Sequence, residues 1–154
     1  MADLLTEATG SREVPQPPRQ VWQALAVLQP YCAVCDVSYV VTGRGVGTTF
    51  VCVPGRLDGA EPPATALRGE IVDWAPPRVV TTRLVRAGET WTTRMELAGT
   101  PAGGTRVDLR LTREAAGSSR LVRAVQRRSA ERLVQRTVDA ELDRLPAHLD
   151  QAGG

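Results

Sequence analysis

Few side chains in this sequence can do chemistry, and the first group consists of thiols and one imidazole. Cys32 and Cys35 form a C-x-x-C pair, Cys52 follows alone, and His148 is the single histidine. A C-x-x-C pair can bind zinc with further ligands, or exchange disulfides where it opens a helix after a parallel strand. The sequence shows no second C-x-x-C and no parallel-sheet pattern, and His148 lies beyond Pro146 near the C-terminus. We therefore expect an exposed terminal histidine, cysteines that pack as small apolar residues, and neither a metal nor a cofactor.

The second group consists of a carboxylate and several guanidinium groups on predicted strands. Asp73 stands between the apolar Ile71 and Trp74, and burial among apolar side chains would raise its pKa and suit it to general acid or base catalysis. Arg83 can polarise a carbonyl or stabilise an enolate if it faces a cavity; Arg94 and Arg110 would do so in a different register. For all of them a solvent-facing or ion-paired side chain is the alternative. The sequence contains no lysine, which excludes Schiff-base chemistry through a side-chain amine.

Composition limits the partners of the protein. The 154 residues are enough for one domain, 1–154, with a hydrophobic core. The formal charge of +2 is too small to indicate nucleic-acid binding, and the arginines near the C-terminus alternate with acids, which is typical of a solvated helix face. No apolar run is long enough to span a membrane, and no signal peptide pattern is present. We expect a cytoplasmic protein, monomer or homodimer, with no nucleic-acid partner and no membrane span.

A long helix near the C-terminus must position these side chains. Over residues 118–145 apolar residues recur every three to five positions, which predicts an amphipathic helix roughly 40 Å long. Ser118 or Ser119 can cap its N-terminus, and Pro146 should end or kink it near Leu145. A helix of this length with a narrow apolar stripe needs a broad apolar surface to lie on.

The preceding residues predict that surface as a curved sheet. Residues 3–14 predict a strand in which Gly10 marks a possible bulge, followed by a helix over 18–28 and a helical turn over 31–36. Short strands joined by tight turns then predict an antiparallel meander, over residues 37–42, 47–53, 67–74, 79–85, 90–97 and 105–112. The predicted class is α+β, with about seven strands in the order β-α-α-β6-α.

Four segments carry a resemblance to a known family. They are Val14-Pro15-Gln16-Pro17-Pro18-Arg19-Gln20-Val21-Trp22, Gly45-Val46-Gly47-Thr48-Thr49-Phe50, Gly69-Glu70-Ile71-Val72-Asp73-Trp74-Ala75-Pro76-Pro77-Arg78 and Gly103-Gly104-Thr105-Arg106-Val107. In order and spacing they are similar to the proline-then-V-W helix start, the G-x-G-T-x-F strand entry, the P-P-R hairpin and the G-T-x-V strand opening of the polyketide cyclase/dehydrase-like branch of the SRPBCC (START-like) superfamily. The resemblance implies the helix-grip fold, a curved antiparallel sheet wrapped around the long C-terminal helix. These motifs fix turns and unusual φ values rather than catalytic groups.

A helix that crosses a bent sheet leaves a gap in which a small ligand fits. Strand alternation places Asp73 on the inner face beside the predicted ligand-binding residues of the strands, which are Phe50, Cys52, Ile71, Trp91, Thr93, Met95 and Leu109. The long helix adds Val125, Ser129, Leu133 and Val138, and the connector adds Tyr31 and Tyr39. A register error of one residue would reverse each strand assignment, and ordinary core packing is the alternative for every one of these residues.

The resemblance implies that the protein binds a hydrophobic small molecule, of the polyketide type found in biosynthesis, and that any catalysis is cyclisation or dehydration. It also implies sparse Arg, Tyr and Ser/Thr hydrogen bonding, for which Tyr31, Tyr39 and Thr93 are the local candidates. The catalytic candidates are Asp73, Arg83 and Tyr39. No catalytic motif matches residue by residue. Two alternatives stay open: a non-catalytic carrier or sensor of lipid-like ligands, without a buried titratable group, and a protein-interaction module, with a collapsed cavity and an exposed apolar patch.

Overall fold

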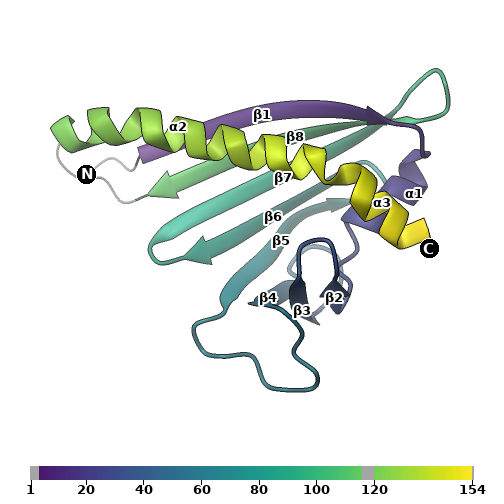
Figure 1. The fold of residues 1–154 in the computed structure, drawn as a ribbon, viewed down its shortest axis with the longest axis horizontal. Helices are drawn as coiled ribbons and strands as arrows, with labels where there is room; N and C mark the ends of the chain where they lie inside the picture. Colours follow the sequence, from purple (N-terminus) through teal and green to yellow (C-terminus); the bar gives the residue numbers. More distant parts are fainter. Residues whose placement is uncertain (1–3, 116–119, 154) are drawn as a thin grey trace.

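The computed structural model describes residues 4–115 and 120–153, and in them an eight-stranded antiparallel sheet curves around a bent C-terminal helix (Figure 1). The strand order is β1-β8-β7-β6-β5-β4-β3-β2, so the first and last strands along the chain pair with each other. The predicted α+β helix-grip fold is confirmed. Its elements are β1 Leu4–Val14, α1 Pro18–Leu25, β2 Tyr31–Cys32, β3 Val37–Thr42, β4 Thr49–Pro54, β5 Leu67–Ala75, β6 Val79–Arg86, β7 Glu89–Gly99, β8 Thr105–Ala115, α2 Arg120–Asp143 and α3 Leu145–Gly153.

The additional strand is β2, which replaces the helical turn predicted for residues 31–36. Tyr31 pairs with Ser38 and Cys32 pairs with Val37, so β2 and β3 form an antiparallel hairpin. The turn between them ends at Asp36, whose φ of 53° lies in the left-handed region. A right-handed helical turn cannot contain that conformation, whereas aspartate tolerates it in a hairpin turn.

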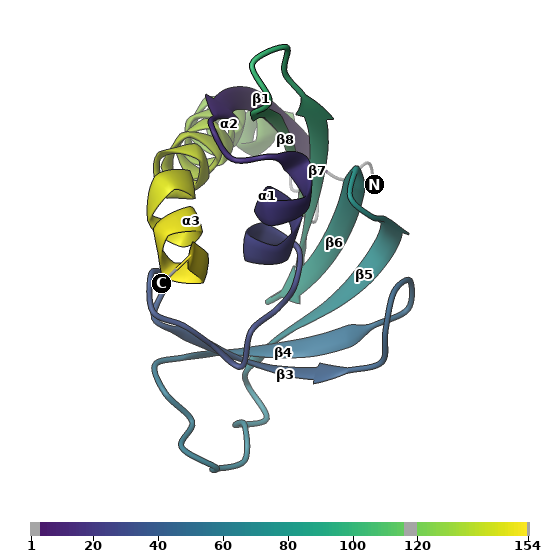
Figure 2. The ribbon, with the colours of Figure 1, turned by 90° about the vertical axis from the view of Figure 1, so that its right-hand side faces the viewer.

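The C-terminal helix changes direction at Pro146, as predicted. Helix α2 ends at Asp143 and α3 begins at Leu145. Because proline has no N–H, the carbonyl of Leu142 loses its helical donor, and Arg12 Nη1 donates to that oxygen at 3.1 Å instead. The bend places α3 beside α1 on the concave side of the sheet (Figure 2). The predicted caps, Ser118 and Ser119, lie outside the described residues.

Helix α2 lies on β1 and β8, and a glycine sets how closely it approaches. A Cβ atom on Gly10 would lie 2.7 Å from Leu142 Cδ1 and 2.9 Å from Val138 Cγ1. Gly10 pairs regularly with Leu109, so the predicted bulge is wrong and the glycine marks close packing of helix on strand. The buried face of α2 consists of Ala130, Val134, Val138 and Leu142.

Helix α1 closes one end of the sheet and begins at the prolines. Pro17 has extended φ and ψ at the N-cap and Pro18 occupies the first turn, where a missing N–H costs nothing. Val21 and Trp22 are buried. The Trp22 ring meets Trp74 edge-to-face, with 4.9 Å between ring centroids. The pair joins α1 to β5, and the cavity described below begins beyond this plug.

Candidate functional site

A cavity of about 460 Å³ lies between the inner face of the sheet, the end of α1 and the bend between α2 and α3. This volume falls within the range of small-molecule sites. Its polar groups are the Tyr39 phenol, three threonines, three thiols, the His148 imidazole, and four longer side chains, Gln29, Arg86, Glu141 and Gln151. The remaining wall is mainly aliphatic and aromatic, and it is formed by Ala24, Leu25, Ala26, Val27, Leu28, Phe50, Leu67, Ile71, Val80, Leu84, Trp91, Met95, Leu109, Leu111, Val138 and Leu145.

The strand residues predicted to face the cavity mostly do so. Regular pairing between β3, β4, β6, β7 and β8 keeps alternate side chains on the concave face. The predicted residues that line the cavity are Tyr39, Phe50, Cys52, Ile71, Trp91, Thr93, Met95 and Leu109. Their contact with a ligand stays a prediction. Thr82, which the sequence analysis did not name, lines the same wall next to Thr93, its direct pairing partner.

Asp73 does not face the cavity, because a β-bulge reverses the alternation of β5. Ile71 pairs with Thr82 and Asp73 pairs with Thr81, so Val72 is an additional residue without a partner. Ile71 is therefore buried, whereas Asp73 lies on the outer face with 55% of its side chain exposed. Its Oδ2 lies 3.4 Å from Arg94 Nη1. The expectation of a buried general acid at this position is wrong, and the ion-paired alternative is the observed one.

The arginine candidates also lie on the outer face. Arg83 is exposed and stands between Thr82 and Leu84, which line the cavity. Arg94 pairs with Asp73 and Glu96 there, and Arg110 Nε lies 3.8 Å from Glu7 Oε1. Successive side chains of a strand point to opposite faces of the sheet, so Arg83 must point outward because Thr82 points inward. The expectation that an arginine of this group polarises a ligand inside the cavity is wrong.

Of the helix residues predicted for the cavity, Val138 lines it, whereas the other three lie on the opposite side of α2. Val125 is 75% exposed and Leu133 is 41% exposed, and Ser129 is exposed as well. The face that packs on the sheet runs through Val134 and Val138 instead. Helix α2 has apolar residues on both sides, so periodicity alone selects the wrong one.

The two tyrosines have different surroundings. Tyr31 donates from its hydroxyl to Asp36 Oδ1 at 2.7 Å and stacks under Arg56, 4.0 Å from the ring centroid, and it does not line the cavity. Tyr39 does, with its ring edge-to-face with Phe50. Burial raises the pKa of the Tyr39 phenol. It is therefore a neutral hydroxyl that can donate a hydrogen bond to a ligand.

At the start of β7, Trp91 of the cavity wall belongs to a hydrogen-bonded group with Glu89 and Arg113, which do not line the cavity. Arg113 Nε donates to Glu89 Oε2 at 3.1 Å, and its Nη2 pairs with Glu89 Oε1. Trp91 Nε1 donates to Glu89 Oε2 at 3.0 Å. The Arg113 guanidinium holds the pKa of Glu89 below its usual range. Arg113 follows Val107, Leu109 and Leu111 at every second position of β8, so strand alternation was the signal that could have placed it on the inner face.

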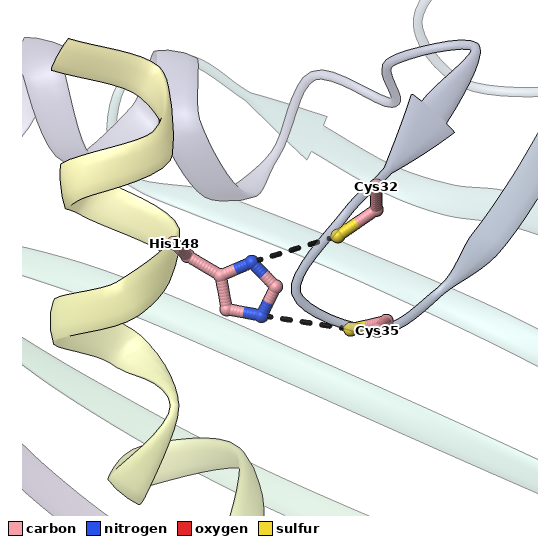
Figure 3. Close-up of side chains that lie close together, drawn as sticks. All are labelled: Cys32, Cys35 and His148. Atoms are coloured by element: carbon pink, nitrogen blue, oxygen red, sulfur yellow. Dashed lines mark hydrogen bonds between the residues drawn. The ribbon is translucent and has the colours of Figure 1, made fainter. Parts of the chain in front are cut away.

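At the other end of the cavity, Cys32 and Cys35 of the β2–β3 hairpin meet His148 of α3 (Figure 3). Cys32 Sγ lies 3.8 Å from His148 Nδ1, and Cys35 Sγ lies 3.6 Å from His148 Nε2. Burial lowers the pKa of His148 and raises that of Cys35 to about 11. The expectation of an exposed terminal histidine is wrong, because the bend at Pro146 turns α3 back over the cavity.

A curved antiparallel sheet that grips a C-terminal helix over an apolar cavity defines a protein of the helix-grip class. The chain belongs to the family described as polyketide cyclase / dehydrase and lipid transport, whose family model matches residues 6–150. No curated protein sequence matches the chain significantly. Within the described residues, no helix is both long and apolar enough to cross a membrane.

Solved structures show the same fold. A Staphylococcus aureus protein of unknown function, SA2116, superposes with a TM-score of 0.75 at 12% identity, over 98% of this chain and 97% of the other. TTHA0849 from Thermus thermophilus gives 0.69 at 20% identity, over 96% and 99%. The ZhuI aromatase/cyclase from Streptomyces sp. R1128 gives 0.67 at 16% identity, over 97% and 94%. At these identities the likeness concerns the fold alone.

Proposed function

We propose that the protein binds a flat hydrophobic molecule of the polyketide type in the cavity between the sheet and the α2–α3 bend. The observation that carries this proposal is a cavity of about 460 Å³ whose wall is mainly apolar, with polar groups at a minority of its positions. Such a site removes much of a ligand's apolar surface from water, which favours binding by about 25 cal/mol per Å². The family description and the fold shared with an aromatase/cyclase support the choice of ligand class.

The polar points favour a ligand with oxygen substituents. Tyr39 and the paired Thr82 and Thr93, all of which carry hydroxyls, line the cavity from β3, β6 and β7. No protein partner for the Tyr39 hydroxyl exists within the described chain, so a ligand carbonyl can accept its hydrogen bond without competition. The open cavity also speaks against a protein-interaction module, for which a collapsed interior is expected.

Cyclisation or dehydration of the bound molecule is the second candidate function, and the Tyr39 phenol is the feature that favours it. A neutral hydroxyl that donates to a carbonyl oxygen stabilises the negative charge that develops there during aldol-type ring closure. Asp73 and Arg83 take no part in this proposal because they lie on the outer face. A carrier would bind the same molecule without converting it.

Ligand binding is tested by thermal shift and native mass spectrometry with flat aromatic polyketides, fatty acids and sterols. A ligand at 100 times its Kd raises the free energy of unfolding by about 2.7 kcal/mol. Thr93→Phe should fill the cavity and abolish the shift. Thr92→Phe changes the preceding residue of β7, which does not line the cavity, and is the matched control that should keep the shift. Equal loss in both variants, or no shift with any ligand class, would contradict the proposal.

The contribution of the phenol is tested with Tyr39→Phe, which removes only the hydroxyl. Loss of one hydrogen bond worth about 0.5–1.5 kcal/mol should weaken polyketide binding roughly two- to tenfold. Arg83→Ala on the outer face should leave the affinity unchanged. Turnover of a bound polyketide that falls more than its affinity in Tyr39→Phe would favour cyclisation over carriage.

A further inference from the structure

The Cys32–Cys35–His148 cluster has the composition of a metal site. Its three ligand atoms, two Sγ and one imidazole nitrogen, all lie within 4.8 Å of one another. We propose that these three residues bind a zinc ion whose fourth coordination position is accessible from the cavity. The proposal is independent of the cavity's organic ligand.

The elements around the cluster hold the three side chains together from distant parts of the chain. Cys32 ends β2, and Cys35 lies in the hairpin turn just before Asp36. His148 reaches the hairpin from α3, and Gln151, three residues later on the same helix face, accepts a hydrogen bond from Val34 N through Oε1 at 3.1 Å. One turn of α3 therefore contacts the hairpin turn twice, through His148 at the thiols and through Gln151 at the backbone between them.

Each sulfur–nitrogen distance is close to the separation of two zinc ligands, but the two distances end at different ring nitrogens, and the three ligand atoms together lie within 4.8 Å. With Zn–S bonds of about 2.3 Å and Zn–N bonds of about 2.0 Å, tetrahedral ligand atoms lie about 3.5–3.8 Å apart. The sulfur–nitrogen contacts measure 3.8 Å for Cys32 and 3.6 Å for Cys35. The two thiols face different ring nitrogens (Figure 3), so binding needs the imidazole to turn until one nitrogen faces both sulfurs.

The donor set selects the class of metal. Two thiolates and an imidazole suit zinc and other soft or borderline transition metals, whereas magnesium and calcium take oxygen ligands. No fourth His, Cys, Asp or Glu joins this cluster in the described ranges. Glu141 is close in the cavity wall, but its Oε1 already accepts from Arg144 Nη1 at 3.3 Å.

Three protein ligands leave one coordination position for water or for a ligand atom, as in zinc sites where the metal meets a substrate. Cys32, Cys35 and His148 all line the cavity, so that position is reachable from it. A disulfide between the two cysteines is the competing outcome, and it would remove both thiolate ligands at once.

The experiment uses the full chain, reduced and stripped of metal, and titrates zinc against a chromophoric chelator. We expect one zinc per chain, a rise in Tm on zinc addition, and a thiolate-to-metal charge-transfer band when Co²⁺ replaces zinc. Cys35→Ser and His148→Gln should each weaken zinc binding on the order of 100-fold, because each removes one of three protein ligands. Cys52→Ser is the matched control, since Cys52 lines the same cavity outside the cluster.

Several outcomes would overturn the proposal. These are no stoichiometric zinc in the reduced chain, equal weakening by Cys52→Ser and Cys35→Ser, or a chain that carries a Cys32–Cys35 disulfide and binds no zinc after reduction. Circular dichroism checks that each variant is folded, and His148→Gln changes no cysteine, so a folding defect in Cys35→Ser cannot decide the result alone. None of these readouts needs an organic ligand, so failure of the zinc proposal can be distinguished from failure of the proposed polyketide binding.

Discussion

Two groups of polar side chains, one near the β6–β7 end of the sheet and one beside α3, are held together in opposite ways. Figure 1 shows the β6–β7 connection at one end of the sheet and α3 at the other. At the first end, Arg113, Glu89 and Trp91 satisfy one another with hydrogen bonds of 3.0–3.1 Å and a two-point ion pair. These groups have little capacity left for a ligand, and their arrangement is typical of a structural network.

At the second end, the polar groups are close but weakly bonded. The sulfur–nitrogen contacts of 3.6 and 3.8 Å are long, and thiols are weak donors and acceptors. These contacts therefore contribute little to the stability of the fold unless an ion or a ligand binds to the cluster. The comparison teaches that polar side chains whose hydrogen bonds are all made to one another form a structural network. Polar side chains that lie close together without strong hydrogen bonds are instead a candidate binding site.

The largest effect of a single substitution on this comparison is expected for Arg113→Ala. Arg113 is only 15% exposed, and its removal leaves the Glu89 carboxylate without its main partner beside the indole of Trp91. We expect the free energy of unfolding in urea to fall by about 1–3 kcal/mol. Arg94→Ala on the outer face is the control, because exposed ion pairs contribute about 0–1 kcal/mol. Equal losses of unfolding free energy in the two variants would show that the Arg113–Glu89 pair stabilises the fold no more than an exposed ion pair.

The next prediction concerns pH at the same end. The folded-state pKa of Glu89 lies below its ordinary value of 4.5, so the ion pair stabilises the fold above that pH and is lost as the pH falls through the folded-state pKa. The advantage of the wild type over Glu89→Gln in free energy of unfolding should stay constant near neutral pH and shrink in acid. In an Arg113→Ala background this acid-dependent difference should largely disappear. A difference that persists there would implicate another partner.

Where the sequence predicted the fold, local chemistry was enough. Prolines before α1, the bend at Pro146 and the turns between strands each act within a few residues. Inward-facing rows on β4, β7 and β8 followed simple alternation because these strands pair without irregularity.

The site residues that the sequence misplaced depend on contacts that local patterns do not contain. The bulge at Val72 adds one residue to β5 and turns Asp73 outward. Its one trace in the sequence is the pair of consecutive apolar residues Ile71 and Val72, which fits a buried strand equally well. Helix α2 carries apolar residues on its outer side, including Val125 and Leu133, and its buried face is set by close packing on Gly10. His148 meets Cys35 across 113 residues of sequence, which no motif spacing predicts.

The smallest effect is expected at the second end, for His148→Gln in the metal-free chain. Because the sulfur–nitrogen contacts are weak and glutamine keeps a polar side chain of similar length, the free energy of unfolding should change by less than about 1 kcal/mol. With zinc present the two proteins should differ clearly in stability. The free energy of unfolding of the wild type rises by RT ln(1 + [Zn]/Kd), and that of the variant rises by almost nothing at the same concentration. Urea unfolding of both proteins, with zinc and with chelator, gives the four values required. A large loss in chelator would instead make this end a structural network like the first, since the histidine would then stabilise the fold without any ion.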